Sequence, residues 1–211
     1  MSYRRIAIAI ATAITPLLVS TPATATEVTP ILAYRAGGEV VNTTTNTKYS
    51  ADSSSTIGLI IGSEPYDGGK QFELYYSHQS TDIGSIDLAS PTTPSTTLDL
   101  PLTIDYLHIG GTAPISDYDK IRTFVSGGLG FSYLSPGLND LDSELRASFS
   151  LGIGLKWPVT DRVAVRLETR GFATLFNNNS SLFCNNGGCS FSVSGNYFTQ
   201  YEVFAGVAIG F

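Results

Sequence analysis

The residues best placed to do chemistry are charged side chains that recur at every second position near the C-terminus. Arg166, Glu168 and Arg170 alternate with other residues, and Glu202 continues the pattern near the end of the chain. Because a strand turns alternate residues to one face, these groups would form a ladder of opposite charges. Such a ladder could line a narrow ion path, or it could neutralise itself and fix the strand register. The near balance of charge favours the second interpretation.

A second pair of reactive side chains is Cys184 and Cys189, separated by Asn-Asn-Gly-Gly. In an exported protein two nearby thiols indicate a disulfide, and Asn and Gly permit a tight reversal between them. A closed zinc site needs four ligands, and neither histidine of the chain lies nearby. The spacing also differs from a redox-active Cys-x-x-Cys pair. We therefore expect a structural disulfide, and neither a metal nor a cofactor.

The elements that position these residues follow from alternation with period two. Along Tyr197–Phe211 one face is apolar and ends on aromatic residues, whereas the opposite face is small or polar. Seven earlier segments show the same pattern, which is clearest in Leu145–Trp157 and Val163–Phe176. The eight predicted strands span Pro30–Val40, Thr56–Glu64, Gln71–Gln79, Leu98–Thr112, Ile121–Leu134, Leu145–Trp157, Val163–Phe176 and Tyr197–Phe211.

The segment Leu98–Thr112 fits this pattern less cleanly. Asp105 would lie on its polar face, opposite the apolar residues Leu100, Leu102, Ile104 and Tyr106. The alternation then loses phase near Leu107, which predicts a β-bulge at that position.

The connections between these strands alternate in length. Short ones carry Pro, Asp and Gly turn residues, whereas longer ones, rich in Ser, Thr, Asn and Asp, span 41–55, 82–97, 135–143 and 177–196. Short turns on one side and long loops on the other are typical of an outer-membrane barrel, and they place both termini on the periplasmic side. We expect the acidic loop residues to be solvated, with binding of divalent cations or lipopolysaccharide as the alternative.

Residues 1–25 have the layout of a secretory signal peptide. Arg4 and Arg5 are followed by the uncharged, apolar stretch Ile6–Val19, and Ala23-Thr24-Ala25 supplies small residues for cleavage. The stretch is too short for a membrane anchor. The expected organisation is a signal peptide followed by a single barrel domain at 26–211.

Composition narrows the class of protein further. Charged residues make up 14% of the 211 residues, against about 25% in ordinary soluble domains, and 21 glycines with 11% aromatics favour an all-β fold. The 18 acidic residues outnumber the 12 basic ones, which argues against nucleic-acid binding. No segment after the signal is apolar over about 18 residues, so no transmembrane helix is predicted.

The charged residues decide between a soluble and a membrane barrel. If these charged side chains face the lumen of an eight-stranded barrel, they can pair with one another and fill it. The alternative is a soluble barrel, in which they would face water around an apolar interior. Aromatic residues near strand ends match the girdles of a lipid-facing surface. The sequence thus predicts an eight-stranded antiparallel up-and-down transmembrane β-barrel. Its lumen charge network would comprise Arg35, Glu73, Asp105, Arg122, Arg146, Arg166, Glu168, Arg170 and Glu202, with Glu39 and Lys156 on the same polar faces.

The sequence resembles the small eight-stranded outer-membrane β-barrel family of OmpA/OmpX type, and a proteobacterial group of outer membrane beta-barrel proteins. The resemblance is carried by Phe124–Gly130, Leu151–Gly171, Phe183–Cys189 and the ending with Gly206, Ile209 and Phe211. It implies location in the outer membrane. It also implies that Gly206, Ile209 and Phe211 form an assembly signal read by the barrel-inserting machinery.

Together these features predict a monomeric, non-enzymatic barrel with a side-chain-filled lumen and a structural or cell-surface role, in contact with outer-membrane lipids and lipopolysaccharide. Three alternatives stay open: a narrow pore or small-molecule transporter, a soluble periplasmic ligand-binding barrel, and a lipid A-modifying enzyme. The last rests on a resemblance to deacylases with a His-x-Ser pair and an acidic partner at the outer rim. His78-Gln79-Ser80 has this spacing, but Thr81 follows where those enzymes carry Asn.

Overall fold

The computed structural model describes residues 27–42, 47–87, 97–118, 120–137, 142–176, 180–185, 188–193 and 197–211. The predicted signal peptide lies outside the described residues. Within the part of the chain that is described, no helix is long and apolar enough to cross a membrane.

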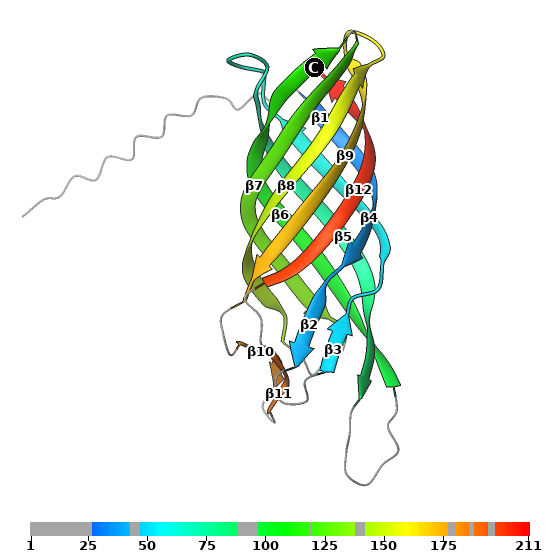
Figure 1. Cartoon of the computed structure of the whole chain (residues 1–211), viewed down its shortest axis with the longest axis vertical. Coiled ribbons are helices and arrows are strands. Elements are labelled where there is room, and N and C mark those ends of the chain that lie inside the picture. The colour runs from blue at the N-terminus through cyan, green and yellow to red at the C-terminus, as the bar shows by residue number, and fades with distance from the viewer. Residues whose placement is uncertain are drawn as a thin grey trace, which may run out of the picture.

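Eight strands close into an antiparallel barrel, which confirms the predicted fold class (Figure 1). Their order around the barrel is β1-β12-β9-β8-β7-β6-β5-β4, so the first and last strands pair and leave no open edge. The barrel strands are β1 (Glu27–Gly37), β4 (Ser54–Gly62), β5 (Gln71–Asp87), β6 (Thr97–Tyr118), β7 (Ile121–Pro136), β8 (Glu144–Pro158), β9 (Val163–Leu175) and β12 (Tyr197–Gly210).

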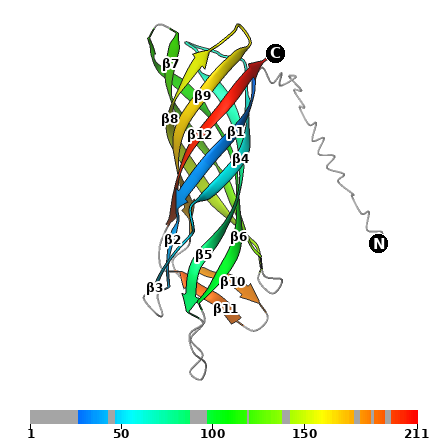
Figure 2. The same cartoon turned by 90° about the vertical axis from the view of Figure 1, so that its right-hand side faces the viewer.

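The two ends of the barrel differ. The short connections β4–β5, β6–β7 and β8–β9 lie at one end, called here the turn end, together with Glu27 and its partner Gly210 (Figure 2). The first of these turns uses positive φ angles at Asp67, Gly68 and Gly69, a backbone conformation that glycine adopts without steric cost.

The opposite end, called the loop end, contains more regular structure than predicted. Four short strands form a second sheet in the order β10-β11-β2-β3 beyond the barrel rim (Figure 1). They are β2 (Glu39–Asn42), β3 (Thr47–Ser50), β10 (Ser180–Asn185) and β11 (Gly188–Val193). Two connections predicted as loops therefore carry strands, and the strand predicted to end at Gln79 continues to Asp87.

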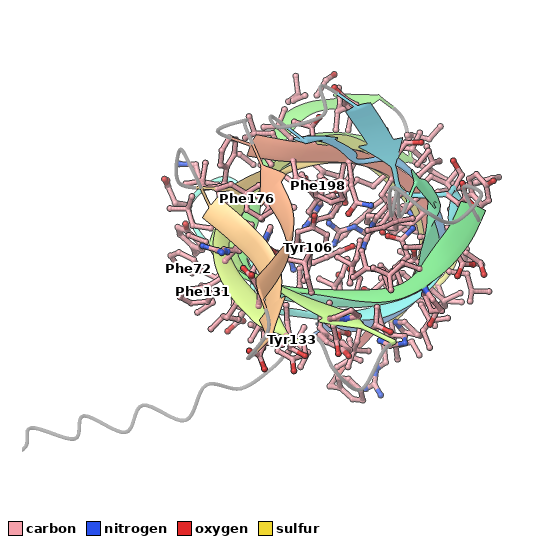
Figure 3. The ribbon with its side chains drawn as sticks, turned by 90° about the horizontal axis from the view of Figure 1, so that it is seen from below. Phe72, Tyr106, Phe131, Tyr133, Phe176 and Phe198 are labelled. Carbon is pink, nitrogen blue, oxygen red and sulfur yellow. The ribbon has the colours of Figure 1, made fainter. Side chains whose placement is uncertain are left out.

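Alternate side chains face the lumen and the outside, as the strand period requires. Viewed along the barrel axis, Tyr106, Phe176 and Phe198 lie inside the ring of strands, and Phe72 and Phe131 lie outside it (Figure 3). The outer face is apolar, with large residues such as Leu32, Leu129 and Ile109 more than 70% exposed. Outward aromatics gather toward the turn end (Phe72, Trp157, Phe211) and the loop end (Tyr34, Tyr76, Tyr133, Tyr201), as in barrels that span a bilayer.

Strand β6 departs from the prediction. Burial alternates without a slip from Leu100 to His108, and the register shift on this strand's pairing with β7 lies between Pro114 and Ser116 instead of near Leu107. The apolar residues expected to face lipid point inward: Leu100, Leu102, Ile104 and Tyr106. They pack with Phe176, Phe198 and other buried residues in an apolar core, which toward the loop end lies beside buried polar side chains such as Gln79 and Gln200.

Candidate functional site: a neutral ion-pair network in the lumen

The centre of the lumen holds a cluster of paired charges from β5 and β9. Arg166 binds Glu73 with two parallel hydrogen bonds of 2.6 and 3.0 Å, and its Nε donates to Glu168 at 3.0 Å. Arg170 donates to Glu168 from the other side at 2.8 Å, and Ser126 adds a hydrogen bond at 2.5 Å. All five side chains are buried, so the cluster is a fully paired network rather than an open path.

A second buried pair joins β1 to β12. Arg35 Nε donates to Glu202 Oε2 at 3.0 Å, and its Nη2 donates to Ser77 Oγ at 2.5 Å. Tyr75 donates a short hydrogen bond to the other oxygen of Glu202. Arg35 and Glu202 are both 0% exposed.

Aromatic rings enclose both clusters. The Arg35 guanidinium lies 4.8 Å from the Tyr106 ring centre and 4.9 Å from that of Phe172, and Arg166 lies 4.8 Å from the Phe124 ring centre. Such stacking stabilises a desolvated cation. Because three arginines are matched by three glutamates in these clusters, the middle of the lumen carries no net charge.

Neutral polar groups continue the network toward the loop end. His108 is buried, with Nδ1 2.9 Å from Ser150 Oγ and Nε2 2.7 Å from Ser148 Oγ. Tyr106 donates to Gln200 at 3.0 Å. No sequence motif surrounds His108, and its place on the inward face of β6 follows only once the phase of that strand is known.

The turn end of the lumen is open and polar. A cavity of about 420 Å³ lies there, lined by residues from the ends of several strands and from the β8–β9 turn. Lys156 crosses it and donates to Glu27 at 2.6 Å and to Gln71 at 2.9 Å. Arg122, predicted in the lumen network, is exposed at this mouth and does not join the central clusters.

Arg146 also lies apart from the central network. It is half-buried near the loop end, forms an ion pair with Glu144, and stacks 5.7 Å from the Phe176 ring centre. The side chain of Glu39 is outside the described residues. The structure therefore brings together six of the predicted residues, namely Arg35, Glu73, Arg166, Glu168, Arg170 and Glu202.

Asp105 corrects the prediction most sharply, because it lies on the outer face of β6. Its neighbours Ile104 and Tyr106 are both 0% exposed, which leaves Asp105 on the opposite side of the strand. One Asp105 oxygen lies 2.8 Å from His78 Nδ1 and accepts a hydrogen bond from Tyr76 at 2.9 Å. The apolar residues around Asp105 in sequence suggested the wrong phase, since both faces of β6 carry large apolar side chains.

The remaining predicted residues lie as follows. Cys184 and Cys189 are direct partners across the β10–β11 ladder, a spacing compatible with a disulfide, which stays a prediction. Gly206 faces the lumen side of β12, whereas Ile209 and Phe211 are exposed on the outside at the turn end. Their role in assembly is likewise a prediction.

Several solved structures are similar to this chain. The neisserial surface protein NspA has 12% identity and a TM-score of 0.53, with 87% of this chain and 97% of that one covered. The N-terminal barrel of Pseudomonas aeruginosa OprF has 14% identity and a TM-score of 0.45, covering 87% and 97% of the two chains. Ail of Yersinia pestis has 12% identity and a TM-score of 0.42, with 87% of this chain and 99% of that one covered. No curated protein matches the sequence.

The family described as outer membrane protein beta-barrel domain matches residues 11–198. This span includes most of the barrel strands and the residues that form the central ion pairs up to Arg170. The match agrees with the closed antiparallel barrel and its apolar outer face. The chain belongs to the outer membrane protein β-barrel domain family, and its location is the outer membrane.

Proposed function

We propose that this barrel is a structural and surface-presenting protein of the outer membrane whose lumen conducts nothing and carries no reaction. The proposal is supported mainly by the neutral, buried ion-pair network in the lumen centre. Arg35, Arg166 and Glu202 each have an exposed fraction of 0%. A conducting path needs hydrated space along its whole length, and an eight-stranded lumen is only wide enough for side chains.

A second barrier lies at the loop end. Phe176, Phe198, Leu102 and Leu134 are all buried there and form one contiguous apolar core. Water and ions entering the cavity at the turn end would meet first the charged clusters and then this apolar core. The arrangement favours a closed barrel over the narrow pore considered as its alternative.

The proposal is tested by planar-bilayer recording with the purified protein. We expect no steady single-channel steps from the native chain. A larger barrel with an open channel, recorded in the same bilayers, is the positive control for conductance. Steady steps from the native protein that vanish in Arg166→Gln would contradict the proposal and favour the pore.

The surface role would reside in the β2–β3 and β10–β11 hairpins, which form the sheet beyond the loop end. We propose that this sheet contacts lipopolysaccharide or neighbouring cells, and that the barrel works as a monomer inserted by the barrel-assembly machinery. Cross-linked pull-downs from intact outer membranes test this. Loss of the captured partner on shortening β10–β11, with the β4–β5 turn shortened as control, is the expected result. Equal capture by both variants would contradict it.

A further inference from the structure

A sharp change of polarity crosses the outer face of β5, β6 and β7. On the turn-end side of this line the outward residues are apolar, including Leu74, Leu107 and Phe131; on the loop-end side they are polar, including Ser80 and Thr103. Outward Tyr76 and Tyr133 lie along it, and Tyr133 is the cross-strand partner of Asp105. Since aromatic girdles mark membrane interfaces, this line marks the boundary between acyl chains and head groups.

Two side chains with the chemistry of a hydrolase triad, a histidine and an aspartate, meet at this boundary. His78 and Asp105 are direct partners across the β5–β6 ladder, and His78 Nδ1 lies 2.8 Å from Asp105 Oδ1. Tyr76 donates to the same oxygen at 2.9 Å and holds the carboxylate in place. With Nδ1 engaged by the carboxylate, the imidazole presents Nε2 on its other side, as a general base requires.

Ser80 supplies the nucleophile position. It lies two residues after His78 on the same outward face of β5 and is exposed. Two residues of a strand span about 6.6 Å between Cα atoms, a separation that an imidazole and a hydroxyl can bridge as their side chains turn toward each other. Hydrogen bonds of this kind often tighten only when substrate binds.

We propose that Ser80, His78 and Asp105 form a catalytic triad that hydrolyses ester-linked acyl chains of lipids in the leaflet at the loop end. This inference goes beyond the structural role proposed above and departs from the non-enzymatic expectation. It depends on the position of Asp105 on the outer face of β6, outside the lumen.

The reaction balances with water as the only co-reactant. His78 Nε2 takes the proton of Ser80 Oγ while the oxygen attacks the ester carbonyl, and the imidazolium then gives that proton to the departing alcohol. The acyl-serine is next attacked by water, activated by the same imidazole, which releases a fatty acid and restores Ser80. Asp105 stays ionised throughout and stabilises the imidazolium.

A glycine-lined depression on the same face fits the acyl chain. Gly111 and Gly127 are direct partners on β6 and β7, so two neighbouring outward positions carry no side chain. A hollow of about 360 Å³ lies at this level, lined by Ile109, Leu129, Leu151 and other residues. Its nearest edge, Ile109, is four residues from Asp105 toward the membrane interior, about 13 Å along the strand. A long acyl chain entering from the interface reaches this hollow, whereas a short one does not.

The test uses the full mature barrel folded in detergent micelles, with p-nitrophenyl palmitate as substrate and a fluorophosphonate as a covalent serine probe. We expect Ser80→Ala and His78→Ala to lower kcat/KM on the order of 10³-fold or more, and Asp105→Asn by a similar factor. Peptide mass spectrometry should place the phosphonyl adduct on Ser80. Thr169→Ala, an outward hydroxyl removed on β9 across the barrel, is the matched control and should leave hydrolysis unchanged.

Gly127→Leu tests the hollow independently of the triad. A Cβ at Gly127 meets only Leu151 Cδ2 at 3.4 Å and Ser150 O at 3.7 Å, so a side chain can be added there. Hydrolysis of the palmitate ester should fall several-fold, while hydrolysis of the butyrate ester should not change. Equal loss on both esters would remove the hollow from the proposal.

Two lipid arms identify the source of the ester: phosphatidylethanolamine–phosphatidylglycerol vesicles and purified lipid A, with released fatty acid measured by mass spectrometry. Release in either arm that is lost in Ser80→Ala supports the triad. The proposal is overturned if the folded native barrel hydrolyses none of these esters and Ser80 takes up no probe, or if hydrolysis persists in Ser80→Ala. Neither result bears on whether the lumen conducts ions. The esterase assay therefore tests the triad alone, and the bilayer recording tests the closed lumen alone.

Discussion

The lumen network makes Glu202→Gln the most informative single change. Glu202 is 0% exposed and accepts hydrogen bonds from Arg35 and Tyr75. The amide keeps the shape and can still bond to Tyr75, but it removes the charge that Arg35 faces. Breaking a buried ion pair from one side costs about 3–5 kcal/mol, because the remaining charge is left uncompensated. We therefore expect the free energy of unfolding to fall by about that amount.

Removing both charges should cost much less. Arg35→Met keeps an unbranched apolar side chain and removes the guanidinium that lies against the Tyr106 and Phe172 rings, and replacing a buried pair by uncharged groups is often close to neutral. The double variant Arg35→Met/Glu202→Gln should thus recover most of the loss. The coupling between the two changes would then be several kcal/mol, well above the value of about 0–1 kcal/mol that is usual for exposed pairs.

Denaturant unfolding in detergent micelles measures these differences. Trp157, the single tryptophan of the chain, lies outward on β8 near the turn end and is 54% exposed in the absence of lipid, so its emission reports loss of the apolar environment. A cost below about 1 kcal/mol for Glu202→Gln, with additive effects in the double variant, would show that the lumen is hydrated. That result would refute the reasoning about a dry, paired network.

Three further outcomes follow. Gly206→Val should destabilise the barrel by about 1–3 kcal/mol in the same unfolding assay, because a Cβ there would lie 2.8 Å from atoms of three residues of β1; an unchanged midpoint would contradict this. Cys184 and Cys189 should react with maleimide only after reduction, and labelling without reductant would exclude the disulfide. The Lys70 hydrogen bond lowers the pKa of the exposed Asp67 carboxyl, so this pair persists at neutral pH and is lost as pH falls through the folded-state pKa. Lys70→Met should return that pKa to its ordinary value in an NMR titration, and no change would contradict the assignment.

The barrel itself could be predicted because its lipid-facing residues leave a simple pattern. In β8, β9 and β12 outward apolar residues alternate with inward small or charged ones, and the phase read from the sequence matches the structure. A bilayer-spanning strand must turn its apolar side to lipid, so finding the apolar face of a strand also shows which residues face the lumen.

Strand β6 shows where this logic fails. Near the loop end its inner face carries Leu102 and Ile104, and toward the turn end its outer face carries Leu107 and Ile109. Both sets are apolar, so hydrophobicity alone cannot assign the phase. The inner set packs in the core that closes the lumen, a tertiary requirement that no single strand reveals.

The candidate sites were affected by the same error. The wrong phase for β6 predicts Asp105 in the lumen and so separates it from His78. The correct pairing of β5 with β6 brings the two side chains within 2.8 Å on the outside. The short strands β3, β10 and β11 lie in connections predicted as loops. Cys189, Phe191 and Val193 of β11 do alternate with serines, but the run is short and stands among Ser, Asn and Gly residues that are typical of loops.

The central claim is that apolar outward residues contact acyl chains while the charged ladder faces the barrel axis. It is tested most directly by tryptophan quenching in vesicles of lipids brominated on their acyl chains, in a Trp157→Phe background. Tryptophan placed at Leu129 or Leu151, each about 70% exposed on the outer face, should be strongly quenched. Tryptophan in place of the inward Phe172, 2% exposed, should not. Quenching at the Phe172 position, with none at Leu129 and Leu151, would contradict the orientation on which the account depends.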